Sequence, residues 1–296
     1  MEKEKIADWF QRLQDSICKA LEKADGSGRF QEDLWDREAG GGGRSRVMTT
    51  GSIIEKGGVN FSAVHGDLPL KIREALGLSK ATFYATGVSI VIHPFSPMIP
   101  IVHMNVRYFE LSDGQCWFGG GIDLTPHYVV AEDAAFFHTQ LKNACDKHHA
   151  SYYKTFKAWA DDYFYIKHRK ETRGIGGIFF DKLTPNENTN KETLFRFVQE
   201  VGTAFSPTYL HLIEKNKALP FGKKEKTWQM VRRGRYVEFN LVLDKGTKFG
   251  LDTEGRTESI LMSLPPQANW LYDHKPSPGS AEEQTIHFLQ KGINWA

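Results

Sequence analysis

Three consecutive strand-like segments in the first half of the chain most constrain its fold. Residues 82–93 and 99–110 are rich in β-branched and aromatic residues with partial alternation, and three prolines form a corner between them. A third segment, "QCWFGGGIDLT" at 115–125, follows after a short connection. Because short connections join antiparallel neighbours, these segments predict an antiparallel group of strands.

Helical and strand patterns surround this group. Residues 4–24 place apolar side chains at spacings of three and four, which predicts an amphipathic helix. Residues 29–66 indicate strands and turns, with the run Gly40–Gly43 interpreted as a flexible turn. The later segments predict helices at 131–170, divided near residue 150, and at 190–217, with a break at Pro207, strands at 174–181 and 235–244, and a short final helix near 281–291.

No internal repeat and no long linker divide the 296 residues. Strands first, then helices and late strands, favour a single α+β domain over residues 1–296, built on a large antiparallel sheet. The net charge of +2 gives no indication of a nucleic-acid-binding surface. Three cysteines without a CxxC spacing suit a reducing compartment. No apolar run approaches the length of a membrane span, and no signal peptide is visible, so a cytoplasmic protein is expected.

Several familiar catalytic motifs are absent from the sequence. It contains no HExxH, no GxSxG, no GxxxxGK[ST] and no GxGxxG that follows a strand. A two-histidine, one-carboxylate iron site could be drawn from His93, His103 and Asp123 on adjacent strands. The compact His-x-Asp/Glu of such sites is replaced here by "HMN", which weakens that interpretation.

The strand at 99–110 carries three polar side chains on one face. Side chains two apart along a strand share a face, so His103, Asn105 and Arg107 lie together. Burying such groups is unfavourable unless something polar meets them. A planar guanidinium suits a carboxylate, and an imidazole transfers protons near neutral pH. A polar network linking strands and a ligand-facing site are both open, and the ligand-facing site is favoured.

With these residues identified, the chain resembles the oxygen-dependent coproporphyrinogen III oxidase family. The resemblance runs from about residue 29 to the terminal "INWA". It is carried by "EKGGVNFSAVHG", "ATGVSIVIHPFSPMIPIVHMNVRYF", "WFGGGIDLTPHY", "DDYFYIKHRKETRGIGGIFFD", "RRGRYVEFNLVLDKGTKFGL" and "GRTESILMSLPP".

The resemblance implies an oxidative decarboxylation. The propionates on rings A and B of coproporphyrinogen III become vinyl groups, O2 is the acceptor, CO2 and H2O2 are released, and protoporphyrinogen IX is formed. It also implies a homodimer of subunits in which a large antiparallel sheet lies between helices, with a dimer-forming region at about 236–272 that includes the strand expected there. No redox cofactor is implied.

The resemblance also implies a set of site residues. Ser89, Asn105, Val106, Arg107, Gly255 and Arg256 correspond to substrate-binding positions, His103 to a proton donor, and Asp244 and Asp123 to carboxylates acting on pyrrole nitrogens. Glu254 departs from the family pattern, which has a small residue there. Arg107 and Arg256 would anchor propionates. Asp244 would collect pyrrole N–H groups, or would instead begin the "DKGT" turn.

Metal binding is left open. Bacterial members of the family imply histidine ligands at His93, His103, His138 and His168. Taken singly, His138 suits a hydrogen-bonded core histidine and His168 the end of a helix, where a cation complements the dipole. Two other functions therefore stand beside the cofactor-free oxidase: a metal-dependent version of the same oxidase, and a non-catalytic tetrapyrrole-binding carrier.

Overall fold

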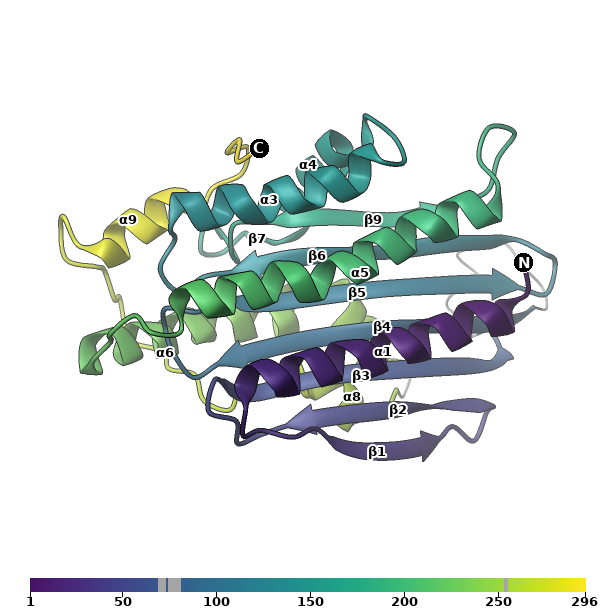
Figure 1. The fold of residues 1–296 in the computed structure, drawn as a ribbon, viewed down its shortest axis with the longest axis horizontal. Coiled ribbons are helices and arrows are strands. Elements are labelled where there is room, and N and C mark those ends of the chain that lie inside the picture. Colours follow the sequence, from purple (N-terminus) through teal and green to yellow (C-terminus); the bar gives the residue numbers. More distant parts are fainter. Residues whose placement is uncertain (69–72, 74–80, 253–254) are drawn as a thin grey trace.

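The computed structural model of the chain describes residues 1–68, 73, 81–252 and 255–296. At its centre lies a seven-stranded antiparallel sheet in the order β1-β2-β3-β4-β5-β6-β9 (Figure 1). Its strands are β1 Gln31–Asp36, β2 Gly41–Met48, β3 Ile54–Asp67, β4 Thr82–Pro94, β5 Ile101–Leu111, β6 Cys116–Thr125 and β9 Gly177–Leu183. A separate two-stranded hairpin joins β7 Tyr165–Ile166 to β8 Glu171–Thr172.

Helices cover both faces of the sheet. In the view of Figure 1, α1, α3 and α5 cross the near face, and α6 and α8 lie behind the strands. The helices are α1 Lys3–Asp25, α3 Ala131–Asp146, α4 Tyr152–Tyr163, α5 Lys191–Asn216, α6 Lys223–Glu238, η1 Phe239–Leu243, α7 Lys245–Asp252, α8 Thr257–Leu261 and α9 Ala281–Phe288. Among the described residues, no helix is both long enough and apolar enough to cross a bilayer.

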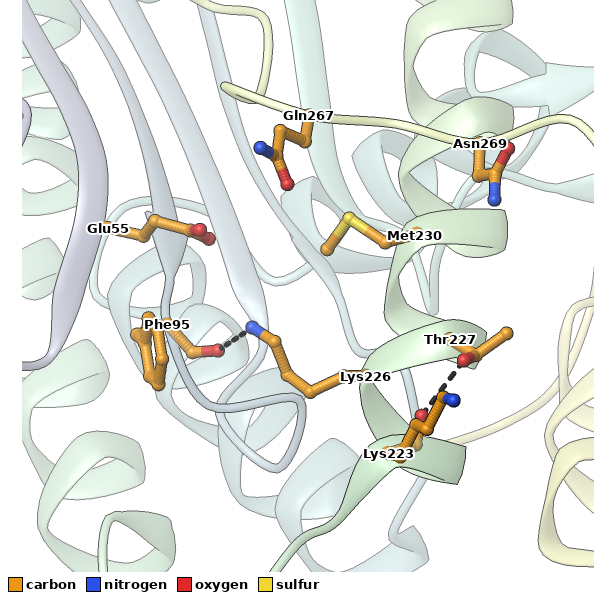
Figure 2. A pocket seen from close by; sticks show the side chains of 8 residues that line it. All are labelled: Glu55, Phe95, Lys223, Lys226, Thr227, Met230, Gln267 and Asn269. Carbon is orange, nitrogen blue, oxygen red and sulfur yellow. Dashed lines mark hydrogen bonds between the residues drawn. The ribbon is translucent and has the colours of Figure 1, made fainter.

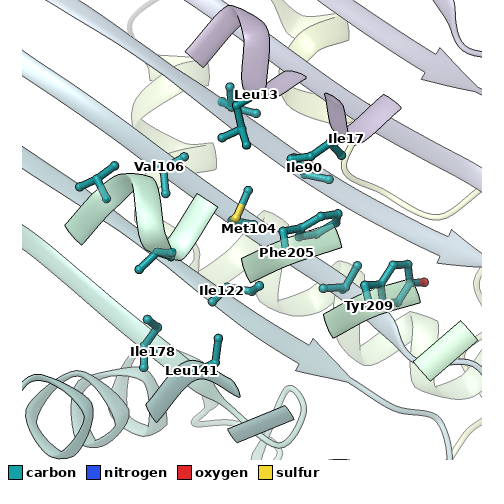
Figure 3. Close-up of a cluster of buried hydrophobic side chains, with 14 of the residues drawn as sticks. Leu13, Ile17, Ile90, Met104, Val106, Ile122, Leu141, Ile178, Phe205 and Tyr209 are labelled. Atoms are coloured by element: carbon teal, nitrogen blue, oxygen red, sulfur yellow. The ribbon is translucent and has the colours of Figure 1, made fainter. Parts of the chain in front are cut away.

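The main hydrophobic core lies between the sheet and the near helices. Alternate residues of β4, β5 and β6 point toward α1 and α5 and are almost fully buried. Figure 3 shows them meeting: Ile90, Met104, Val106 and Ile122 from the strands, Leu13 and Ile17 from α1, Phe205 and Tyr209 from α5, and Leu141 from α3. We call this side of the sheet the apolar face.

Much of the predicted architecture is confirmed. The fold is α+β around a large antiparallel sheet, and the first helix, the strands at 82–93, 99–110 and 115–125, and the final helix form where the sequence predicts them. The predicted division near residue 150 separates α3 from α4. The strand expected at 174–181 is β9, displaced toward the C-terminus.

Helix α5 continues through Pro207, so the predicted break is wrong. Proline removes one intrahelical hydrogen bond, which usually kinks or ends a helix. Here Phe205 precedes it, and Thr208 and Tyr209 follow it, all buried on the apolar face. Packing on both sides of the proline therefore holds the segment helical.

The strand predicted at 235–244 is also wrong, because this segment is the end of α6 followed by the π-helical turn η1. Residues 231–236 are all buried, so no exposed stripe marks a helical period. The segment's aromatic and β-branched residues then imitate a strand. The dimer-forming region expected at 236–272 is consequently helical and irregular where it is described, with residues 253–254 outside the description.

Two smaller expectations need correction. The helical segment predicted to reach residue 170 ends at Tyr163, and the β7-β8 hairpin follows. His168 therefore lies in a hairpin turn and not at a helix end. The glycine run is not a flexible turn throughout, because Gly41, Gly42 and Gly43 begin β2 and pair with β3.

Candidate active site

The face of the sheet opposite the core carries a flat, polar surface. The register places Ser45, Asn60, Ser89, Asn105 and Gly121 in one row across five strands. The neighbouring row contains Gly43, Ser62, Gly87, Arg107 and Gly119. Directly paired residues share a face of the sheet, so these two rows form one surface. We call these ten residues the polar floor.

His103 lies at one side of the polar floor and is held by a buried carboxylate. The two are paired across β5 and β6, and His103 Nδ1 lies 2.6 Å from Asp123 Oδ1. Asp123 is 2% exposed, whereas the His103 side chain is 23% exposed. An ionised carboxylate only accepts hydrogen bonds, so Nδ1 donates and Nε2 is the ring nitrogen left for a ligand.

The second oxygen of Asp123 accepts a hydrogen bond from buried Arg173. Arg173 Nη2 lies 2.6 Å from Asp123 Oδ2, and Nη1 lies 2.9 Å from Asn240 Oδ1 of η1. The guanidinium also packs against the rings of Phe164, Tyr236 and Phe239, at 4.4, 4.6 and 4.6 Å from their centroids. Arg173 thus links the connection between β8 and β9, α6 and η1 to the sheet.

This ion pair fixes the charge state of the site. Burial alone would raise the pKa of Asp123, but the charge of Arg173 and the His103 contact outweigh it and hold that pKa below its usual value. Burial lowers the pKa of Arg173, but Asp123, together with Tyr236 and Asp244, raises it more. Both groups are therefore charged at neutral pH, and His103 has a permanent acceptor at Nδ1.

Arg107 lies on the polar floor with its guanidinium partly exposed. Its Nη1 donates to Asn105 Oδ1 at 2.8 Å and its Nη2 to Asp181 Oδ1 of β9 at 2.9 Å. The side chains of Arg107 and Asp181 are 37% and 32% exposed. A carboxylate arriving from solvent can therefore reach this guanidinium.

Arg256 lies at the opposite, β1 side of the same face. Its guanidinium pairs with Asp33 and donates to Ser259 Oγ at 3.2 Å. Ser259 Oγ in turn lies 3.0 Å from Ser45 Oγ, which donates to Asn60 Oδ1 at 2.8 Å. One arginine thus lies on the polar floor at β5 and another at its β1 side, and each guanidinium can form charge-assisted hydrogen bonds with a carboxylate.

Two residues implied by the resemblance, Val106 and Gly255, lie outside the polar floor. Val106 points to the apolar face and is fully buried there, so its side chain is separated from the polar floor by the sheet. Gly255 joins α7 to α8, and its N–H donates to Gly250 O at 2.8 Å. Neighbouring Glu254 lies outside the described residues.

Asp244 is half-buried at the end of η1. It accepts hydrogen bonds from the Tyr163 hydroxyl at 2.7 Å and from the Thr247 backbone N–H, also at 2.7 Å. The second contact caps the start of α7, a common use of aspartate. The structural use anticipated for Asp244 therefore occurs, as a helix cap and not as the turn after a strand.

The four candidate metal-ligating histidines have separate partners. His93 Nε2 bonds Ser263 O, His138 bonds both Tyr153 and Ile175 O, and His168 bonds Glu238. Burial lowers the pKa of His93 to about 3 and of His138 to about 4, so both are neutral. Within the described ranges, no three His, Cys, Asp or Glu side chains are grouped to hold a metal. The arrangement of these four histidines therefore does not fit a single metal site to which all four would be ligands.

Sequence reasoning missed Arg173, Asp181 and Asn240. Arg173 belongs to the basic run "KHRKETR", which composition alone assigns to a solvated face. Arg173 lies six residues before the FFD of β9, in a segment rich in glycine, and this position is the sequence signal that could have indicated a role in the site. Asn240 lies in the segment mistaken for a strand, and Asp181 follows two phenylalanines at what was expected to be a strand end.

A separate cavity of about 370 Å³ lies near the start of α6. It is lined by Glu55, Phe95, Lys223, Lys226, Thr227, Met230, Gln267 and Asn269 (Figure 2). Lys226 points across it and donates to Phe95 O at 2.7 Å. None of the site residues predicted from the sequence lines this cavity, which is separate from the polar floor.

The polar floor, together with His103 and Arg256 beside it, combines three chemical capabilities. Its glycines, serines and asparagines present small polar side chains and backbone on this face of the sheet. Arg107 and Arg256 offer charge-assisted hydrogen bonds to carboxylates. His103, oriented by Asp123, can transfer a proton at Nε2.

Comparison with known proteins identifies a family with matching chemistry. The sequence model described as coproporphyrinogen III oxidase matches residues 5–295. The chain is 51% identical, over 297 aligned residues, to the oxygen-dependent coproporphyrinogen-III oxidase, chloroplastic, of Glycine max. That alignment covers 95% of this chain and 76% of the relative.

Proposed function

This chain belongs to the coproporphyrinogen III oxidase family, and from that membership we propose that it converts coproporphyrinogen III to protoporphyrinogen IX with O2 as oxidant. It is an oxidoreductase of porphyrin and haem biosynthesis. The observation that carries the proposal is the match over residues 5–295 together with 51% identity to an oxygen-dependent relative.

The proposed reaction removes one carboxylate at a time from the propionates of rings A and B. Each step converts –CH2–CH2–COO⁻, O2 and H⁺ into –CH=CH2, CO2 and H2O2. The Cα–carboxylate bond breaks and a hydrogen leaves the adjacent carbon with its electron pair, which reduces O2. One proton enters for each propionate, so the site needs a proton donor as well as anchors for anions.

The polar floor and the residues beside it supply candidates for these roles. Arg107 and Arg256 anchor propionates, and Ser89 and Asn105 contact the macrocycle between them. His103 Nε2 donates the proton, and Asp123 keeps its ring oriented through Nδ1. Arg173 is a positioning residue, because its charge keeps Asp123 ionised.

The roles of Asp244, Gly255 and Val106 are also proposals, and the contacts of each residue limit what it can do. Asp244 acts on the pyrrole N–H groups through the acceptor positions that Tyr163 and the cap of α7 leave free on its two oxygens. Gly255 contacts the substrate through its backbone. Val106 contributes indirectly, by holding β5 in the core. The Asp244→Ala variant should lose most of its kcat, and retention of kcat would remove Asp244 from the reaction.

Turnover needs no redox cofactor in this proposal, and no step passes through a metal. An aerobic assay on coproporphyrinogen III, with the protein stripped of metal and kept in EDTA, tests both points. Oxygen-dependent formation of protoporphyrin fluorescence, absent in an anaerobic control, is expected. Turnover only after one divalent ion is returned would favour the metal-dependent oxidase, and no turnover at all would favour the carrier.

The chain forms a homodimer through residues in the range 236–272. Several large apolar side chains of this range are exposed: Leu241, Val242, Phe249, Leu251, Trp270, Leu271 and Tyr272. Exposed apolar side chains that form one patch mark a contact surface. The Val242→Glu/Tyr272→Glu variant should elute as a monomer in size exclusion with light scattering. Leu34→Glu, which changes an exposed apolar residue on β1, should remain dimeric.

The chain works in a reducing compartment, because Cys18, Cys116 and Cys145 are all free thiols. The cytosol expected from the sequence and the chloroplast named for the relative both qualify. Imaging the full chain with a C-terminal fluorescent tag distinguishes the two.

A further inference from the structure

The Arg107–Asp181 pair has no role in the reaction described so far. Asp181 lies on β9, two strands from Arg107, and the guanidinium reaches it across β6. The contact joins Nη2 to Oδ1 at 2.9 Å, and both side chains are about one-third exposed. Arg107 is the proposed anchor for a substrate carboxylate, but in this structure its guanidinium is already paired with the carboxylate of Asp181.

The backbone around this pair is arranged to let it form. Gly119 lies under it, and a Cβ there would stand 2.5 Å from Asp181 Oδ1 and 2.8 Å from Arg107 Nη2. The pairing of β6 with β9 shifts register at this point, between Phe118 and Gly120. Lys182, next to Asp181, has φ 50, in the left-handed region. Irregularities of this kind redirect side chains beside functional sites.

The proposed reaction changes the charge that Arg107 faces. A bound propionate is an anion, whereas the vinyl group that replaces it is neutral. After CO2 leaves, a guanidinium covered by product would lack a counterion, and an unpaired charge away from water is unfavourable. A carboxylate of the protein within reach removes that penalty.

We propose that Asp181 is a stand-in carboxylate that competes with the substrate propionate for Arg107 and takes its place when that propionate is lost as CO2. The inference rests on the proposed function and extends it to a further positioning residue. Asp181 weakens binding of the substrate, because the substrate must displace it. It favours decarboxylation, because the pair with Arg107 re-forms as the propionate disappears.

This role predicts an unusual kinetic signature for Asp181→Asn. The amide keeps the size of the side chain but does not compete for Arg107 as an anion. Substrate should bind several-fold more tightly, and kcat should fall several-fold, because the bound propionate is stabilised and its loss is no longer compensated. A joint decrease of KM and kcat indicates that a ground-state penalty has been removed.

The experiment compares wild type, Asp181→Asn, Asp181→Glu and Asp113→Asn. Asp113 is an exposed aspartate of the β5-β6 turn and serves as the matched control. The Kd of coproporphyrinogen III is measured anaerobically by quenching of tryptophan fluorescence, and kcat and KM are measured aerobically. Thermal melting shows that each variant is folded.

The expected result is a lower Kd and a lower kcat for Asp181→Asn, with values near wild type for Asp113→Asn and movement back toward wild type for Asp181→Glu. A higher Kd would overturn the proposal, because Asp181 would then assist binding. An unchanged kcat would also overturn it, because Arg107 would then hold a propionate that does not react. Failure of the wild type to turn over with O2 would instead reject the proposed function.

Discussion

The two faces of the seven-stranded sheet are built from the same strands, but one face forms the hydrophobic core and the other carries the candidate site. On β5, Met104 and Tyr108 point into the core beneath α1 and α5, while His103, Asn105 and Arg107 point to the polar floor. Residues of the apolar face can be exchanged for others of similar volume. Those of the polar floor depend on particular partners. Successive side chains of a strand point to opposite faces, so one strand can contribute every second residue to the core and the others to the candidate site.

The largest expected effect tests this separation at the buried ion pair of Arg173 and Asp123, which lies on the polar side of the sheet. Arg173→Met removes the cation that pairs with Asp123 and leaves a buried carboxylate with only the hydrogen bond from His103 among its side-chain partners. The free energy of unfolding should fall by about 3–5 kcal/mol, measured by urea denaturation. Adding Asp123→Asn removes the unpaired charge, so the double variant should regain stability and still have low activity, because His103 has lost its acceptor. A stable single variant would contradict the importance of this pair.

Leu141→Ala tests the apolar face alone. Leu141 of α3 is fully buried, and its truncation should lower the free energy of unfolding by about 2–5 kcal/mol. At a temperature where the variant is folded, kcat should stay close to that of wild type, because the change lies behind the sheet. A large loss of kcat in the folded variant would show that the two faces are coupled.

Arg107→Ala tests the polar floor alone. Losing charge-assisted hydrogen bonds worth about 1.5–3 kcal/mol should lower kcat/KM roughly 10- to 150-fold. Stability should change by less than about 1 kcal/mol, because the pair with Asp181 is partly exposed. Arg107→Lys keeps the charge without the planar fork and should recover only part of the loss. A near-normal kcat/KM in Arg107→Ala would reject the anchoring role.

The smallest expected effect concerns pH. His138 is buried beside the apolar face, and burial lowers its pKa to about 4, whereas in the unfolded chain it titrates near 6.5. The unfolded state therefore binds a proton first, and stability falls as pH drops from about 6.5 to about 4. His138→Gln should flatten that fall by about 1 kcal/mol per pH unit, measured by urea denaturation between pH 7 and pH 5. An unchanged slope would show that other groups govern it.

The sequence predicts the two faces unequally. Alternation along residues 82–125 sorts side chains correctly, since the period of a strand is a local property. It also brings together His103, Asn105 and Arg107. The partners of these residues could not be predicted, because Asp181 and Arg173 reach the sheet from β9 and from the connection before it, through register and packing.

The same limit explains the errors near α6. Tyr236 and Phe239 resemble strand residues because helix α6 is buried on most sides, and burial removes the polar stripe that reveals a helical period. At Pro207 the local signal predicts a helix break, but tertiary contacts on both sides keep the segment helical. Local patterns fail where packing from several directions decides the conformation.

The strand order also bears on how the chain folds. From β1 to β6 every strand pairs with its neighbour in sequence, so the sheet can grow by successive additions as the chain leaves the ribosome. Only β9 joins after an interruption, once α3 and α4 have been made. The last strand to dock carries Asp181, so the carboxylate that meets Arg107 arrives after the rest of the polar floor is already in place.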